Sequence, residues 1–209
     1  MERIDRYAIA FIVGGSILTA SLVTAAAAWH APSTPAGAAP AATTAAHVAV
    51  APLHETLVIA TPDMLGSNEM PAYVPSTLTL PANTTVSITI VNFDDATALP
   101  AGSEQFATAT GVTGPLQVQA LDPTDPNADA PATAVTSMDP QSGVSHTFTI
   151  AKLGINVPIA PKSKTTFTIR TGKAGTFQWQ CMDPCGTGPS GFGGAMAAKG
   201  YMQGTLTVV

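Results

Sequence analysis

Short runs of alternating hydrophobic and polar residues recur along most of this chain. The clearest is Thr85–Phe93 ("TVSITIVNF"), in which every second residue from Val86 to Asn92 points to the same face. Five further runs have the same pattern: Ser76–Leu80, His146–Ile150, Thr165–Arg170, Gly175–Cys181 and Gly204–Val209. Thr56–Ala60 ("TLVIA") reads as a short apolar strand. Pro- and Gly-rich turns separate these runs, and no helical periodicity accompanies them. The pattern therefore predicts an all-β domain built as a β-sandwich.

The alternation is interrupted by a long segment, residues 94–145. It is rich in Asp, Pro, Ala and Thr, and only Gly114–Leu121 ("GPLQVQAL") reads as a strand. Segments of this length between strands are usually functional or disordered. We interpret 94–145 as an insertion within a folded domain that spans residues 54–209.

The first 29 residues are predicted to form a cytoplasmic stub and a membrane anchor. Tyr7–Trp29 contains no ionisable side chain after Tyr7 and is long enough to span about 30 Å of hydrocarbon. A cleaved signal peptide is the alternative, although the hydrophobic part of such peptides is usually only about 7–15 residues. Arg3 and Arg6 precede the span, and the next basic residue is Lys152. The positive-inside rule then predicts a single-pass protein of the cell membrane, with a cytoplasmic N-terminus and an extracytoplasmic C-terminal domain.

Residues 30–53 form a Pro/Ala/Thr-rich stretch without alternation, which is typical of a semi-extended linker. His47 lies within it and His54 directly follows it. We interpret both as exposed histidines of a tether rather than as ligands.

Charge is sparse in this sequence. Charged residues make up 10% of the chain, against about 25% in ordinary globular domains, and the net charge is −5 at pH 7. The acidic surface is either simply solvated or a docking face for a basic partner, such as a soluble cytochrome. This balance argues against nucleic-acid binding. No Ser/His/Asp set or carboxylate pair stands out, so we do not expect the chain to be catalytic alone.

The two cysteines, Cys181 and Cys185, follow an alternating strand near the C-terminus. Outside the cytoplasm such a pair can form a disulfide, or both thiolates can bind a metal. The spacing alone does not decide between these alternatives.

The C-terminal third of the chain resembles the cupredoxin domain of subunit II of haem–copper (cytochrome c) oxidases, in its single-span variant. The resemblance covers about residues 144–209 and rests on "SHTF", "INV", "GTFQWQCMDPCG" and the final "YMQGTLTVV". It implies a cupredoxin-like Greek-key β-sandwich behind one transmembrane helix. It also implies a role in the respiratory chain, in which the domain passes electrons through copper to a haem-bearing oxidase partner. The donor would be a soluble basic cytochrome or a cupredoxin.

The resemblance also implies a set of copper ligands. His146 matches the first histidine, Cys181 and Cys185 match the bridging thiolates, and Met202 matches the weak methionine ligand. Asp183 occupies the position whose backbone carbonyl serves as a ligand. Thiolate, thioether and imidazole groups are ligands that copper favours.

One ligand of that family has no counterpart in this chain. The second histidine should follow Cys185 by four residues, where the sequence has Pro189 within a Gly-rich insertion. Three alternatives remain. In the first, a CuA-like site is completed by Met196, His47, His54 or a partner subunit. In the second, a mononuclear copper site uses His146, one or both cysteines and Met196 or Met202. In the third, copper is absent, Cys181 and Cys185 form a disulfide, and the domain is an accessory or assembly subunit.

Trp179 is expected on the same strand face as Cys181. Its position suits either an ordinary core residue or a step on an electron path.

Overall fold

The computed structural model describes residues 53–66, 70–122, 124–125, 130–183, 185 and 194–209. The predicted anchor and nearly all of the predicted linker fall outside these residues, as do Pro189 and His47. In the part of the chain that is described, no helix is both long and apolar enough to cross a membrane.

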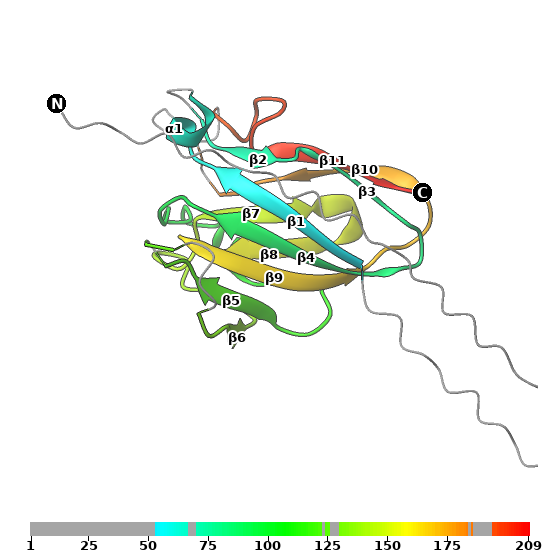
Figure 1. Ribbon diagram of the computed structural model, residues 1–209, viewed down its shortest axis with the longest axis horizontal. Coiled ribbons are helices and arrows are strands. Elements are labelled where there is room, and N and C mark those ends of the chain that lie inside the picture. The colour runs from blue at the N-terminus through cyan, green and yellow to red at the C-terminus, as the bar shows by residue number, and fades with distance from the viewer. Residues whose placement is uncertain (1–52, 67–69, 123, 126–129, 184, 186–193) are drawn as a thin grey trace, which may run out of the picture. The chain divides into compact units, whose positions relative to one another are not determined.

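Two β-sheets face each other and form the predicted sandwich (Figure 1). The first sheet has the order β2 (Ala72–Val74), β1 (Leu53–Ala60), β4 (Thr85–Asn92), β9 (Ser163–Arg170), β5 (Leu116–Ala120) and β6 (Thr133–Val135). The second has the order β3 (Thr77–Leu80), β11 (Gln203–Val208), β10 (Gly175–Gln180), β7 (His146–Ile150) and β8 (Ile155–Ile159). Three short helical turns connect strands: α1 (Pro62–Leu65), η1 (Glu104–Ala107) and η2 (Ala151–Leu153).

The sequence alternation becomes the inner and outer faces of the sheets. In β4 every second residue from Val86 to Asn92 is buried, as predicted, and the residues between them are partly exposed. The buried faces of the two sheets meet in one hydrophobic core that includes Ile88, Phe148 and Trp179. Burial of these large apolar side chains is the main stabilising contribution to such a sandwich.

The chain passes repeatedly from one sheet to the other. It leaves β2 in the first sheet, forms β3 in the second, and returns to β4 in the first. Two strand pairs are parallel, β1 with β4 and β3 with β11, and the remaining pairs are antiparallel. The first described strand, β1, begins at Leu53.

Strand β8 was not predicted, and its sequence explains why. Its five residues, "INVPI", include a single polar side chain, Asn156, and also Pro158, although all five are buried in the structure. Proline cannot donate a ladder hydrogen bond and is therefore confined to edge strands or bulges. β8 accommodates Pro158 because it is an edge strand of its sheet.

The insertion at 94–145 is substantially ordered. Its predicted strand is present as β5, which pairs with β9, and the unpredicted β6 extends the sheet beyond it. Leu99, Ala107 and Val144 form a small second core within the insertion. The insertion therefore enlarges the first sheet rather than hanging from it as a loop.

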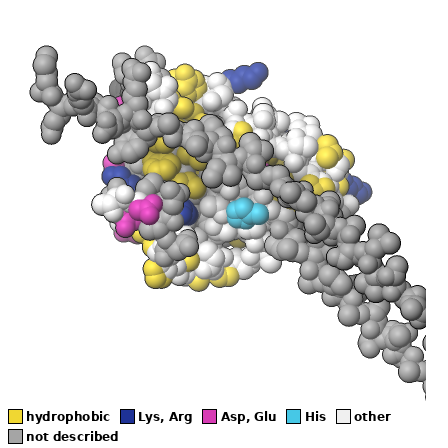
Figure 2. Space-filling model, in the orientation of Figure 1, with side chains coloured by type: hydrophobic (Ala, Val, Ile, Leu, Met, Phe, Trp, Pro, Cys, Tyr) yellow, Lys and Arg dark blue, Asp and Glu magenta, His cyan; other side chains and the backbone are white. Residues whose placement is uncertain are grey.

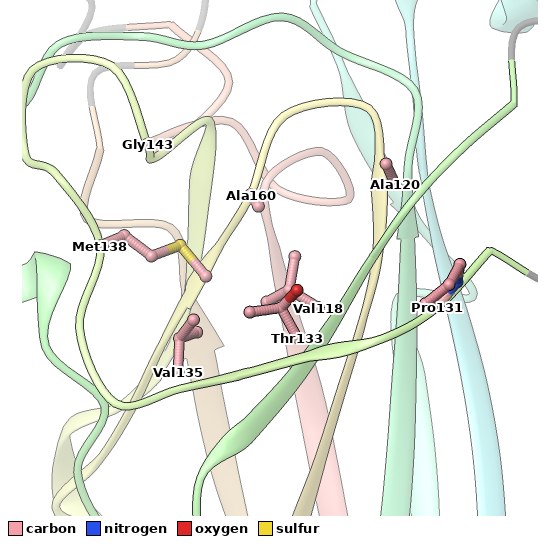
Figure 3. Close-up of a pocket in the computed structure, with 8 residues that line it drawn as sticks. All are labelled: Val118, Ala120, Pro131, Thr133, Val135, Met138, Gly143 and Ala160. Carbon is pink, nitrogen blue, oxygen red and sulfur yellow. The ribbon is translucent and has the colours of Figure 1, made fainter.

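An apolar cavity of about 350 Å³ lies beside β5 and β6 (Figure 3). Val118, Val135 and Met138 are among its lining residues, none of which is titratable. The cavity therefore offers no chemistry of its own.

The surface agrees with the sparse charge of the sequence. On the face shown in Figure 2, uncharged side chains dominate; the acidic ones gather at the left of the view, whereas basic ones lie there and also at the top and the right. The left of the view is the end at which β4 finishes in Figure 1.

Candidate metal centre

Three potential ligands converge at one end of the sandwich. A nitrogen of His146 and the sulfurs of Cys181 and Cys185 all lie within 4.8 Å of one another, and all three residues are buried. Their convergence follows from the strand directions. Because β7 and β10 are antiparallel, His146 at the start of β7 lies beside Cys181 at the end of β10. The three residues form a candidate metal site, as the resemblance implied.

Both cysteines are free thiols in the structure. A metal site of this kind requires that state, because the thiolate is the form of cysteine that binds a metal and a disulfide has none. The Cys181–Cys185 disulfide stays a prediction for an oxidised form of the protein.

The sulfur of Cys181 lies at the centre of the cluster. The backbone N–H of Thr147 donates to it at 3.4 Å, and Nδ1 of His146 lies 3.8 Å away. The backbone carbonyl oxygen of Asp183 is 3.5 Å from the same sulfur. The position expected for a carbonyl ligand is therefore next to the thiol cluster.

The imidazole of His146 is held from both sides. Nδ1 faces Cys181, whereas Nε2 lies 3.2 Å from a carboxylate oxygen of Asp94. Burial lowers the pKa of His146, but the hydrogen bonds and charges of Asp94 and Cys181 outweigh it and raise the pKa to about 9. Metal-free His146 is thus a hydrogen-bonded cation at neutral pH, from which a metal would displace a proton.

The two cysteines differ in acidity. Burial raises the pKa of Cys181, yet hydrogen bonds from Cys185 and His146, together with the charge of His146, bring it well below its ordinary value. The pKa of Cys185 is raised by its hydrogen bond to Cys181 and by burial. Cys181 is therefore the more acidic of the two cysteines.

The carboxyl group of Asp183 has an unusual environment that the sequence did not indicate. The residue is fully buried, and neither carboxyl oxygen has a hydrogen-bond partner. Burial, followed by the negative charge of Cys181, raises its pKa to about 8. Such a group costs stability when ionised, unless a positive charge arrives nearby.

The two candidate methionines lie in the hydrophobic core that contains both cysteines. Met202 precedes β11, and its carbonyl oxygen accepts a hydrogen bond from the backbone N–H of Cys181 at 2.9 Å. Met196 is tied to the same strand end, because the side-chain amide of Gln180 donates to its carbonyl oxygen. Both residues are therefore fixed beside the loop that carries the cysteines.

The structure separates His54 from this site. His54 is exposed and pairs with Ser87, whereas the site adjoins the far end of β4, beyond Asn92. At about 3.3 Å per residue, the five-residue step from Ser87 to Asn92 along β4 separates His54 from the site by about 16 Å. His54 is thus not the missing ligand of its own chain, and His47 lies outside the described residues.

A cluster of aromatic residues backs the site. Trp179 is fully buried and packs against Tyr73 and Phe148 with ring centroids 6.1 and 5.3 Å away. The hydroxyl of Tyr73 donates to the backbone carbonyl of Thr147 at 2.8 Å. This bond stabilises the segment whose N–H points at Cys181, which gives Trp179 and Tyr73 a clear structural role.

The donor set suits a soft or borderline transition metal. Two sulfurs and an imidazole favour copper or zinc over the hard cations that prefer oxygen. The orphaned carboxyl of Asp183 fits the same conclusion, because a cation in the cluster would compensate its buried charge. The residues present therefore fit a copper ion, although they do not by themselves fix the number of ions.

Comparisons with known proteins find cupredoxins among the similar structures. Auracyanin B has a TM-score of 0.36 and 22% identity over 78% of this chain and 93% of its own. Auracyanin A, a "blue" copper protein from the green thermophilic photosynthetic bacterium Chloroflexus aurantiacus, has a TM-score of 0.34 and 18% identity over 76% of this chain and 100% of its own. Reduced rusticyanin has a TM-score of 0.32 and 18% identity, covering 75% and 78% of the two chains.

No family model and no curated protein matches the chain. The candidate metal centre therefore rests on the geometry of this chain's own residues.

Proposed function

We propose that this chain is a membrane-anchored cupredoxin-like electron-transfer protein that carries copper at His146, Cys181 and Cys185. The observation that carries the proposal is the convergence of three buried ligands within 4.8 Å, with both thiols free. Copper would supply a one-electron couple at this site. The protein would supply a fixed set of ligands, shielded from water.

The surroundings of the ligands suit electron transfer. His146 and Cys181 lie at the ends of paired strands, and both are fully or almost fully buried. A rigid site changes little in geometry between the two oxidation states, so little reorganisation accompanies electron transfer. The Thr147 N–H bond to the Cys181 sulfur would tune the reduction potential, since hydrogen bonds to a ligating thiolate alter its donor strength.

A fourth donor would come from groups already placed beside the cysteines. The candidates are the Asp183 carbonyl, which is 3.5 Å from Cys181, and the thioethers of Met196 and Met202. A mononuclear site needs only one of them. A dinuclear CuA-like site would need a further ligand from the partner subunit in place of the missing histidine.

The cellular role rests on the sequence. Three features support a single-pass membrane protein whose C-terminal domain is extracytoplasmic: the apolar span, the positive residues before it and the resemblance to oxidase subunit II. Its partner would be a haem-bearing respiratory subunit, and its donor a basic soluble protein attracted by the acidic surface.

A metal-free accessory subunit is the second candidate. It is favoured by the ligand count, because among the His, Cys, Asp and Glu side chains of the described residues only three converge at this site. In this case Cys181 and Cys185 would be oxidised to a disulfide that staples the loop after β10.

Electron paramagnetic resonance of the full chain, loaded with copper under anaerobic conditions and then oxidised, distinguishes these functions. An unpaired electron localised on a single copper ion gives a different hyperfine pattern from an unpaired electron shared between two copper ions. Either pattern, together with a reversible one-electron couple, supports the proposal. A chain that binds no copper after full reduction of both thiols would support the accessory role instead.

A further inference from the structure

The carboxylate of Asp94 stands directly behind the metal-facing imidazole. His146 is 1% exposed, and its Nε2 atom lies 3.2 Å from Oδ2 of Asp94, a residue far away in sequence. Asp94 follows the end of β4, whereas His146 begins β7 in the other sheet. The contact therefore spans the sandwich at the end where the cysteines lie.

We propose that Asp94 is the positioning residue of the metal centre: it fixes the ring of His146 so that Nδ1 is the ligand atom and Nε2–H is the donor. The inference rests on the proposed function, since it assigns a role within the same site. A ligating histidine commonly donates its other N–H to a carboxylate, which fixes its tautomer and orientation and increases its donor strength.

The other bonds of Asp94 show that its carboxylate is itself held in place. Its second oxygen, Oδ1, accepts the backbone N–H of Asp95 at 2.9 Å. Its backbone carbonyl accepts the N–H of Lys162 at 3.0 Å, and its backbone N–H donates to the side chain of Asn92. Each carboxylate oxygen thus has one donor, and the group cannot rotate without losing a bond.

This arrangement makes Asp94→Asn an informative variant. An asparagine offers one acceptor and one donor, but the site presents two N–H groups, those of His146 and Asp95. Whichever way the amide turns, one hydrogen bond is lost and the negative charge disappears. The neighbouring Asp95 provides the matched control, because it is 78% exposed and pairs only with Lys162 among the ion pairs found.

The experiment compares the full chain carrying Asp94→Asn, Asp94→Ala or Asp95→Asn with the wild type. Copper affinity is measured by competition with a chelator under reducing, anaerobic conditions, and the reduction potential by voltammetry. We expect both Asp94 variants to lose about 10- to 100-fold in affinity. We also expect a higher potential, because a weaker imidazole donor stabilises oxidised copper less. Asp95→Asn should match the wild type in both measurements.

A second readout does not depend on copper. In the metal-free reduced protein, the Nε2–H proton of His146 should give a slowly exchanging nuclear magnetic resonance signal that persists in Asp95→Asn and vanishes in Asp94→Ala. If the wild type binds no copper, the proposed function fails, and this signal still decides whether Asp94 holds the ring. Unchanged affinity and potential in a folded Asp94→Asn protein, or an unchanged signal in Asp94→Ala, would overturn the proposal.

Discussion

The indole ring of Trp179 lies against Gly204 with no room for a side chain between them. The two residues face each other across β10 and β11, and a Cβ atom on Gly204 would come within 2.1 Å of Cζ2 of Trp179. It would also lie 2.4 Å from the backbone carbonyl oxygen of Ser76, which cannot move aside as a flexible side chain would. Gly204 therefore allows Trp179 to lie flat in the core beside the metal centre.

Replacing Gly204 by alanine should destabilise the protein by about 1–3 kcal/mol, because overpacking displaces Trp179 or separates the strands. Chemical denaturation of the metal-free, reduced protein measures the loss. Gly172→Ala is the matched control, because nothing lies within 4 Å of a Cβ at Gly172 and its backbone is not left-handed. A Gly204→Ala protein as stable as the control would show that the close contact is not maintained.

The strand pattern and the resemblance together predicted much of the fold and part of the site. Alternation located β4 and β7 to within a residue. In β4 only one face is fully buried, and in β7 both faces are buried but one of them carries Thr147 and Thr149, so the polar half of the pattern remains. It missed β8, a strand of five residues that has a single polar residue, Asn156, and contains Pro158.

The site was predicted only where a ligand lies inside a motif. His146, Cys181 and Cys185 were identified from the C-terminal motifs, whereas Asp94 was assigned only to the insertion. Its role comes from a contact between strands of different sheets, 52 residues apart in sequence. The buried carboxyl of Asp183 was likewise invisible, since only its backbone carbonyl had been considered. Such long-range contacts and burial follow from tertiary packing, which leaves no local signal.

The contribution of Asp183 to the stability of the metal-free protein should fall as the pH rises from about 4 to about 8. The pKa of Asp183 is raised from 3.8 to about 8, so the folded state holds its proton more tightly than the unfolded state does. The stabilising contribution is complete below about pH 4 and is lost as the pH rises through 8, at up to about 1.4 kcal/mol per pH unit. Cys181, whose pKa is lowered, changes the stability in the opposite direction, and His146, whose pKa is raised from 6.5 to about 9, adds to the fall only above about pH 6.5. The contribution of Asp183 is therefore read from the difference between the wild type and Asp183→Asn.

Denaturation of the reduced protein at a series of pH values tests this assignment. Asp183→Asn should flatten the pH dependence and be more stable than the wild type near pH 8. If the variant keeps the full slope, the dependence arises from another group and the carboxyl of Asp183 is not the source.

Oxidation should switch the metal centre off. In the metal-free protein the lowered pKa of Cys181 favours its thiolate, which adjoins Cys185, so oxidised glutathione can take two electrons, leaving a Cys181–Cys185 disulfide and two molecules of reduced glutathione. Alkylation and mass spectrometry should then find no free thiols, and copper binding should be lost until a reductant restores it. An oxidised protein that still alkylates at both cysteines would contradict this prediction.

The most direct test of the metal centre is the copper content of the His146→Ala variant. The full chain is reduced, loaded with copper, freed of unbound metal and measured by elemental analysis beside the wild type. His54→Ala is the control, since this exposed histidine lies at the opposite end of β1 and β4 from the site. The account predicts bound copper in the wild type and in His54→Ala, and loss of that copper in a folded His146→Ala protein. Full copper content in His146→Ala would contradict it.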